Sequence, residues 1–127
     1  MSSLHFDTNA LIALPEWVRL NHPAVQHIQN GGQAAACAVV WYEFLCGPVS
    51  EQHKNLAYAV LNGRIEPVTE VAAKLAAELF NKSGRARRLR TDALIAACAI
   101  TANAKFATIN HADFLGFVQH GLRLVEN

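Results

Sequence analysis

The chain begins Met1-Ser2-Ser3-Leu4-His5-Phe6-Asp7-Thr8-Asn9, and this stretch decides the fold. Leu4 and Phe6 are the apolar positions of a short buried strand, and the apolar run at residues 10–14 predicts a helix directly after it. Asp7 therefore lies where a strand ends and a helix begins, which is where open α/β sheets bind their ligands. Because Asp is also a favourable helix N-cap, the stretch leaves two interpretations of Asp7 open: a structural cap or a functional acid.

Composition limits the class of protein. The 127 residues include 52% hydrophobic side chains and carry a formal net charge of +1, which is typical of one globular domain spanning residues 1–127. No apolar run approaches the roughly 18 residues of a membrane span, and no signal-peptide pattern opens the chain, so we expect a cytoplasmic protein without membrane attachment. Cys37, Cys46 and Cys98 lack the spacing of a metal site and predict free thiols in a reducing compartment.

Strand and helix patterns alternate along the rest of the chain. The segments 34–40, 64–68, 105–109 and 122–125 predict four more strands, and residues 81–90 predict a polar loop. Ser50 and Thr69 are expected to cap helices, and Pro15 is expected to open a second helix soon after the first. This alternation predicts an α/β class, with five parallel strands in a three-layer α/β/α domain.

The chain has three aspartates, Asp7, Asp92 and Asp113, and each falls at a strand end or a helix start. Because the C-terminal ends of parallel strands meet at one edge of a sheet, Asp7 and Asp113 should face one crevice. Glu43 lies in the helix after the second strand and belongs to the same edge, whereas Asp92 joins them only if its helix begins there. The alternative is that each acid separately caps a helix.

Four carboxylates in one crevice would repel one another and raise the pKa of at least one of them. Mg²⁺ or Mn²⁺ is the natural compensation, because both bind carboxylate oxygens while keeping waters and room for substrate phosphates. Short polar side chains beside the acids would orient waters or carboxylates: Thr8, Asn9, Thr108 and Asn110. His111 is interpreted as a surface residue, since an all-carboxylate site already suits a hard metal.

These stretches resemble the PIN-domain family, and within it the VapC-type toxins. The matching stretches follow the family's order along residues 7–114: Asp7-Thr8-Asn9, Glu43 in Trp41-Tyr42-Glu43-Phe44, Asp92-Ala93-Leu94-Ile95, and Thr108-x-Asn110-x-x-Asp113-Phe114. The resemblance implies a sheet in the order 3-2-1-4-5 with the Leu4 strand at its centre and Asp92 at the acidic edge. Many relatives carry a Ser or Thr shortly before the glutamate, where this chain has Val39, Val40 and Trp41.

The resemblance also implies a function: Mg²⁺- or Mn²⁺-dependent endoribonuclease activity, as the toxin of a type II toxin–antitoxin pair. Asp7, Asp92 and Asp113 would hold the metal, and Glu43 would be a further ligand or a base. The protein would be a homodimer, inhibited by a small antitoxin that covers the crevice. Two alternatives stay open: a PIN-domain nuclease that processes RNA or DNA without an antitoxin, and a non-catalytic RNA-binding module.

Four arginines precede Asp92 within six residues, namely Arg85, Arg87, Arg88 and Arg90. Beside an acidic metal site, such a strip suits the phosphates of an RNA substrate. The alternative is a solvated loop. Trp17, Val18 and Leu20 leave a comparable choice between burial in the core and an apolar surface for a protein partner.

Overall fold

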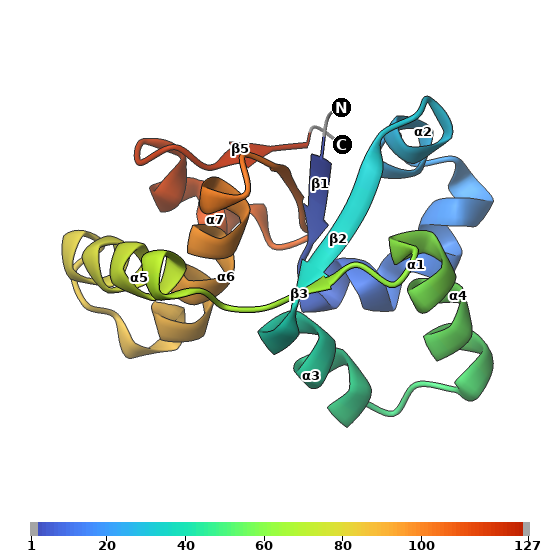
Figure 1. Cartoon of the computed structure of the whole chain (residues 1–127), viewed down its shortest axis with the longest axis horizontal. Helices are drawn as coiled ribbons and strands as arrows, with labels where there is room; N and C mark the ends of the chain where they lie inside the picture. The colour runs from blue at the N-terminus through green and yellow to red at the C-terminus, as the bar shows by residue number, and fades with distance from the viewer. Residues whose placement is uncertain (1–2, 126–127) are drawn as a thin grey trace.

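A computed structural model of the chain describes residues 3–125 (Figure 1). Its five strands are β1 (Ser3–Phe6), β2 (Gln33–Cys37), β3 (Ile65–Glu66), β4 (Lys105–Ala107) and β5 (Arg123–Leu124). All neighbouring strands pair in parallel, in the order β3-β2-β1-β4-β5. The predicted α/β class, the five-stranded parallel sheet and the strand order 3-2-1-4-5 are therefore confirmed.

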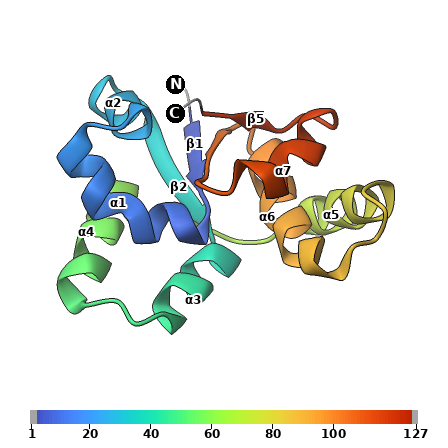
Figure 2. The ribbon, with the colours of Figure 1, turned by 180° about the vertical axis from the view of Figure 1, so that it is seen from behind.

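Helices cover both faces of this sheet (Figures 1 and 2). One layer holds α1 (Thr8–Leu20), α2 (Pro23–Gln29), α3 (Ala38–Cys46) and α4 (Glu51–Leu61), and the other holds α5 (Glu70–Lys82), α6 (Arg90–Thr101) and α7 (His111–Val118). The helix that follows β1, α1, covers one face of the sheet, and the helix that follows the neighbouring strand β4, α7, covers the other. A binding crevice is expected at such a switch point, between the ends of β1 and β4. Among the helices that the structure describes, none combines the length and the apolar character needed to cross a membrane.

The core forms around β1 and α6. Leu4 and Phe6 are fully buried, and the Phe6 ring lies 6.1 Å from the Trp17 ring of α1. Trp17 is thus a core residue, whereas Val18 and Leu20 are 45% and 60% exposed. The inner positions of α6 are mostly alanines and are buried between the sheet and α5, which explains a helix that is apolar nearly all round.

Pro15 lies inside α1, so the prediction that it opens a second helix was wrong. A proline has no N–H to donate, so the Leu11 carbonyl loses its usual partner within the helix. His53 of α4 replaces that partner, because its Nε2 lies 2.8 Å from the Leu11 carbonyl oxygen. A contact between two helices therefore allows α1 to continue to Leu20.

Several predicted boundaries were also wrong. β2 ends at Cys37, and the apolar residues 38–40, predicted as strand, form the first turn of α3. The predicted strands 64–68, 105–109 and 122–125 are shorter, at two or three residues each. Residues 81–90 are only partly loop, since α5 extends to Lys82 and a 3-10 helix, η1 (Arg87–Leu89), leads into α6. A uniformly apolar or polar run carries no period that would locate these ends.

Candidate active site

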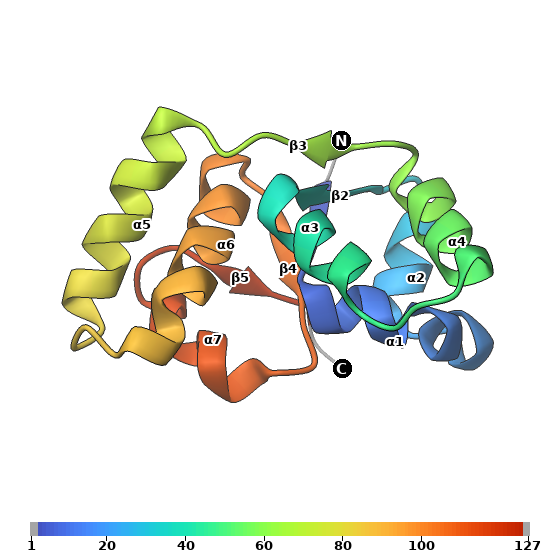
Figure 3. The ribbon, with the colours of Figure 1, turned by 90° about the horizontal axis from the view of Figure 1, so that it is seen from below.

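The C-terminal edge of the sheet gathers residues from four helices (Figure 3). Asp7 follows β1 and caps α1, and Glu43 lies on α3 after β2. Asp113 lies in the first turn of α7 after β4, and Asp92 lies in the first turn of α6. The start of α6 is at this same edge, which is the placement of Asp92 that strand topology alone had left open.

A cavity of about 310 Å³ lies among these residues. Its lining consists of Asp7, Thr8, Asn9, Glu43, Asp92, Ile95, Asn110, Asp113 and Phe114. The structure thus brings together all four acids singled out from the sequence, with three of the four accompanying polar residues. We call this space the acidic cavity.

Asp7 is both a helix cap and a member of the acidic cavity. Its Oδ1 accepts a hydrogen bond from the Ala10 backbone N–H at 2.7 Å, and its Oδ2 accepts one from the Thr108 hydroxyl. The Thr108 oxygen in turn accepts the Asn110 backbone N–H at 2.9 Å. Burial raises the pKa of Asp7, while the bonds from Thr108 and Ala10 oppose that rise. The structure thus confirms that Asp7 caps α1 and places the same side chain at the acidic cavity, while its role as a functional acid stays a prediction.

Glu43 is held by a residue distant in sequence. The Thr8 hydroxyl on α1 donates to Glu43 Oε1 across 2.7 Å, which joins α1 to α3 at the mouth of the cavity. Val39, Val40 and Trp41 offer no hydroxyl of their own. In this chain the hydroxyl next to the glutamate thus comes from Thr8.

Burial and the neighbouring acids act together on Asp92. Burial, followed by the charges of Asp113, Asp7 and Glu43, raises the pKa of Asp92 to about 6. Arg88 opposes this rise, and its Nη1 lies 3.3 Å from Asp113 Oδ1. The four carboxylates therefore form one electrostatic group, with a single arginine at its rim.

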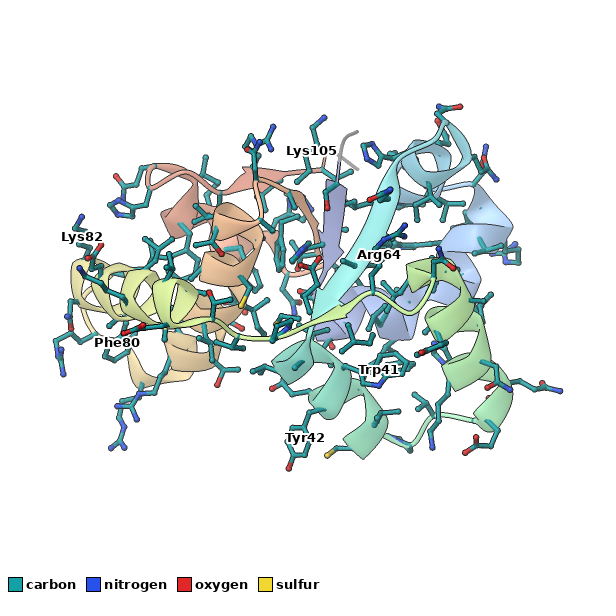
Figure 4. The ribbon with its side chains drawn as sticks, in the orientation of Figure 1. Trp41, Tyr42, Arg64, Phe80, Lys82 and Lys105 are labelled. Atoms are coloured by element: carbon teal, nitrogen blue, oxygen red, sulfur yellow. The ribbon has the colours of Figure 1, made fainter. Side chains whose placement is uncertain are left out.

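The other arginines of the predicted strip lie elsewhere. The guanidinium groups of Arg85 and Arg90 lie over the Phe80 ring, 5.2 Å and 5.4 Å from its centre. They line a separate cavity of about 400 Å³ beside α5, at the end of the molecule where Figure 4 labels Phe80. Arg87 is exposed on η1. Of the four arginines, the structure brings only Arg88 into contact with an acid of the cavity.

Three residues near the acids were missed as site residues in the sequence. Ile95 and Phe114 form an apolar wall of the cavity, and His111 at the start of α7 lowers the pKa of Asp7 by its charge. The spacing offered a signal for two of them: Ile95 follows Asp92 by one helical turn, and Phe114 is adjacent to Asp113. His111 is adjacent to Asn110, but it was interpreted as a surface residue because an all-carboxylate site already suits a hard metal.

The oxygen atoms of the side chains in the acidic cavity are suitable ligands for a hard divalent cation. Carboxylates with hydroxyl and amide oxygens are the ligands that Mg²⁺ and Mn²⁺ prefer, and a cation would relieve the repulsion felt by Asp92. Within residues 3–125, no three His, Cys, Asp or Glu side chains lie close enough together to hold a metal ion as they stand. Thr8 donates a hydrogen bond to Glu43, and Arg88 donates one to Asp113, so two of the four carboxylates are held by neighbouring side chains.

Solved structures provide comparisons along nearly the whole chain. A toxin–antitoxin complex from Klebsiella pneumoniae is 26% identical, with 91% of this chain and 92% of that chain covered and a TM-score of 0.67. FitAcB from Neisseria gonorrhoeae is 20% identical, with 97% and 96% covered and a TM-score of 0.67. VapBC2 from Rickettsia felis, bound to a promoter DNA fragment, is 18% identical, with 97% of both chains covered and a TM-score of 0.66.

A comparison with curated protein sequences finds no match. The sequence model of the PIN domain, however, matches residues 5–115, a range that contains all four acids of the cavity. The match begins within the central strand β1 and ends within α7. The chain therefore belongs to the PIN domain family.

Proposed function

We propose that this protein is a metal-dependent endoribonuclease that uses Mg²⁺ or Mn²⁺, and that it is the toxin of a toxin–antitoxin pair. The observation that carries the proposal is the meeting of four carboxylates in one cavity at the switch point of the sheet: Asp7, Glu43, Asp92 and Asp113. Burial first, and the charges of the neighbouring acids after it, raise the pKa of Asp92, and a half-buried acid beside other acids is more typical of a functional site than of a scaffold.

In this proposal, Asp7, Asp92 and Asp113 hold the cation, and Glu43 is a fourth ligand or a base. A bound cation would make a hydroxide nucleophile available and stabilise the leaving oxygen of the phosphodiester. Thr108 and the Ala10 N–H fix Asp7 in one orientation, so little side-chain freedom remains to be lost on binding. Thr8 holds Glu43 at the mouth, where the glutamate can position a water or accept its proton.

Substrate would approach from the side of Arg88. Its guanidinium is exposed and contacts only one Asp113 oxygen at 3.3 Å, which leaves donors for a phosphate. Ile95 and Phe114 are the apolar residues of the cavity lining, and both are almost fully buried. The predicted RNA-binding role of Arg85, Arg87 and Arg90 stays a prediction, with these residues farther along the path of a longer RNA.

An antitoxin and a second copy of the chain are the proposed partners. The similar structure from Klebsiella pneumoniae, which is 26% identical, is a toxin–antitoxin complex. Apolar side chains near the cavity are available to a protein: Ile12 on α1 is 45% exposed, and Leu45 and Tyr42 on α3 are 41% and 69% exposed. Tyr42 points away from the body of the molecule (Figure 4). The unlinked cysteines fit the cytoplasm as the compartment.

The test is cleavage of labelled single-stranded RNA by the purified protein in Mg²⁺, in Mn²⁺ and in EDTA. We expect cleavage only with metal, and a loss of about 100-fold or more in Glu43→Gln and in Asp113→Asn. Glu70→Gln is the matched control, since Glu70 is an exposed acid in the first turn of α5, outside the cavity.

Three results would reject parts of the proposal. Cleavage that survives EDTA and both variants would exclude the acidic cavity as the catalytic site. RNA binding without cleavage in any metal would support the non-catalytic module instead. Cleavage by a protein that captures no small partner encoded beside it would support an RNA- or DNA-processing nuclease without an antitoxin.

A further inference from the structure

The cavity beside α5 carries two arginines around one aromatic ring. Its volume is about 400 Å³, within the range of roughly 300–1,000 Å³ that is typical of pockets for small organic groups. The guanidinium groups of Arg85 and Arg90 lie 5.2 Å and 5.4 Å from the centre of the Phe80 ring. Small or apolar side chains and one amide complete the lining, namely Ala76, Ala77, Leu94 and Asn81. We call this space the Phe80 pocket.

The Phe80 pocket is suited to a group that carries negative charge. None of the described residues that line it is acidic, and the ion pairs formed within residues 3–125 include neither Arg85 nor Arg90. Arg85 donates instead to the neutral side chain of Asn81. Lys82 ends α5 at the same end of the molecule (Figure 4). The guanidinium groups therefore have N–H donors for an anion, while the apolar lining accommodates a flat organic group attached to it.

The Phe80 pocket and the acidic cavity lie on two sides of one helix. Arg90 and Leu94, one helical turn apart, line the pocket from one side of α6. Asp92 lines the acidic cavity from the other side. Arg88, two residues before Arg90, contacts Asp113 at the rim of the acidic cavity. A helix with its side chains is about 10–12 Å wide, so a strand that crosses the start of α6 passes from one site to the other within a few nucleotides.

We propose that the Phe80 pocket binds a base of the RNA substrate, while Arg85 and Arg90 bind the phosphates beside that base. This inference rests on the nuclease function proposed above, and it names the part of the RNA that the protein selects. Proteins recognise single-stranded RNA by packing unstacked bases on aromatic rings or on guanidinium planes, and the pocket offers both. The oxygen of the Asn81 amide accepts Arg85, and its nitrogen is a donor for the edge of the base.

An acidic protein segment with an aromatic side chain would satisfy the same charges and the same apolar lining. RNA is favoured because Arg88 continues the row of arginines to the acidic cavity, so one strand contacts the pocket and the proposed nuclease site together. A base held at a fixed distance from the four acids would also determine where the strand is cut.

The test measures the binding of labelled single-stranded RNA by fluorescence anisotropy in EDTA, where the proposed nuclease is inactive. One strand is intact, and a second strand of the same length is abasic throughout. Ala77→Phe fills the pocket without changing its charge, because Ala77 is an exposed residue of the lining. Ala73→Phe is the matched control, since Ala73 is an exposed residue one turn earlier on α5 and lies outside this lining.

We expect the parent to bind the intact strand more tightly than the abasic strand. Ala77→Phe should bind the intact strand about tenfold more weakly than the parent does and the abasic strand equally well, while Ala73→Phe behaves like the parent. Arg90→Gln should weaken the binding of both strands and reduce the slope of the logarithm of the binding constant against the logarithm of the salt concentration by about 1. Circular dichroism and thermal unfolding confirm that each variant is folded.

The proposal is overturned if Ala77→Phe and Ala73→Phe bind the intact strand equally well, or if the parent does not distinguish the two strands. It is also overturned if a labelled peptide with a phenylalanine among glutamates loses affinity in Ala77→Phe and RNA does not. Cleavage in Mg²⁺ separates this inference from the proposed function. An Ala77→Phe variant that cuts RNA at the same rate and positions as the parent refutes the base pocket alone, whereas a parent that shows the expected binding and never cleaves refutes the nuclease alone.

Discussion

Replacing Asp92 by asparagine should make the metal-free protein more stable at neutral pH. The surroundings of Asp92 raise its pKa from the ordinary 3.8 to about 6, so the folded protein holds this proton more tightly than the unfolded chain does. Between about pH 4 and pH 6 the folded state therefore binds more protons, and its stability falls as the pH rises through this window. Above it the full penalty of the charged Asp92 is present. The asparagine side chain of the variant carries no charge and escapes the penalty.

The magnitude follows from the same two values. The pKa of Asp92 rises from 3.8 to about 6, and at about 1.4 kcal/mol per pKa unit this corresponds to a loss of about 3 kcal/mol in the free energy of unfolding. Asp92 is only half-buried, so screening by solvent reduces this to about 1–2 kcal/mol. The variant also loses the favourable interaction of an acid with the N-terminus of α6, worth up to about 1 kcal/mol. We therefore expect a net gain of about 1 kcal/mol.

The assay is urea unfolding of the parent and of Asp92→Asn in EDTA, from pH 4 to pH 8. At pH 8 the variant should be more stable, and near pH 4 this advantage should disappear. Glu70→Gln is the control, because it removes an exposed acid from the first turn of α5 and should cost stability slightly. An Asp92→Asn variant that follows the control at every pH would refute the repulsion among the four acids, and with it the main support for a metal site.

Three further predictions concern metal, RNA and the helix α1. Mg²⁺ at a hundred times its Kd should stabilise the parent by about 2.7 kcal/mol, seen as a higher unfolding temperature, and should stabilise Asp92→Asn much less. Equal shifts in the two proteins would place the cation elsewhere. Arg88→Ala should weaken RNA binding, measured by fluorescence anisotropy, and should reduce the slope of the logarithm of the binding constant against the logarithm of the salt concentration by about 1. An unchanged slope would mean that Arg88 pairs with acids alone. His53→Phe should destabilise the protein by about 1–3 kcal/mol, because it leaves the Leu11 carbonyl without a partner, and adding Pro15→Ala should recover part of that loss by restoring a helical N–H. Additive effects in the double variant would contradict this explanation of the proline.

The sequence alone determined the features that depend on neighbouring residues. Ser50 and Thr69 begin helices as predicted, because each side chain accepts the backbone N–H three residues later, at 3.0 Å and 3.1 Å. The alternation of strand and helix patterns was sufficient for the α/β class, and parallel pairing follows from such alternation. The acids were found by their position after strands and at helix starts, which is again a local property of the chain.

Tertiary structure decided what depends on contacts between distant residues. A proline near the middle of an apolar helix predicted a break, and only His53, 42 residues away from Leu11, explains why α1 continues. The six-residue arginine strip was predicted to form one surface, whereas the fold turns Arg88 towards Asp113 and places Arg85 over Phe80.

Asp7 shows the division between local and tertiary information within one side chain. Its bond to Ala10 N–H lies three residues away and was predictable from the sequence, whereas its bond to Thr108 spans 101 residues and exists only because β1 and β4 are neighbours in the sheet. Local propensities act through the next few residues, so they fix where a strand or helix begins. Desolvation and charge repulsion act through space, so the raised pKa of Asp92 arises only when the folded chain buries it and brings the other acids near it.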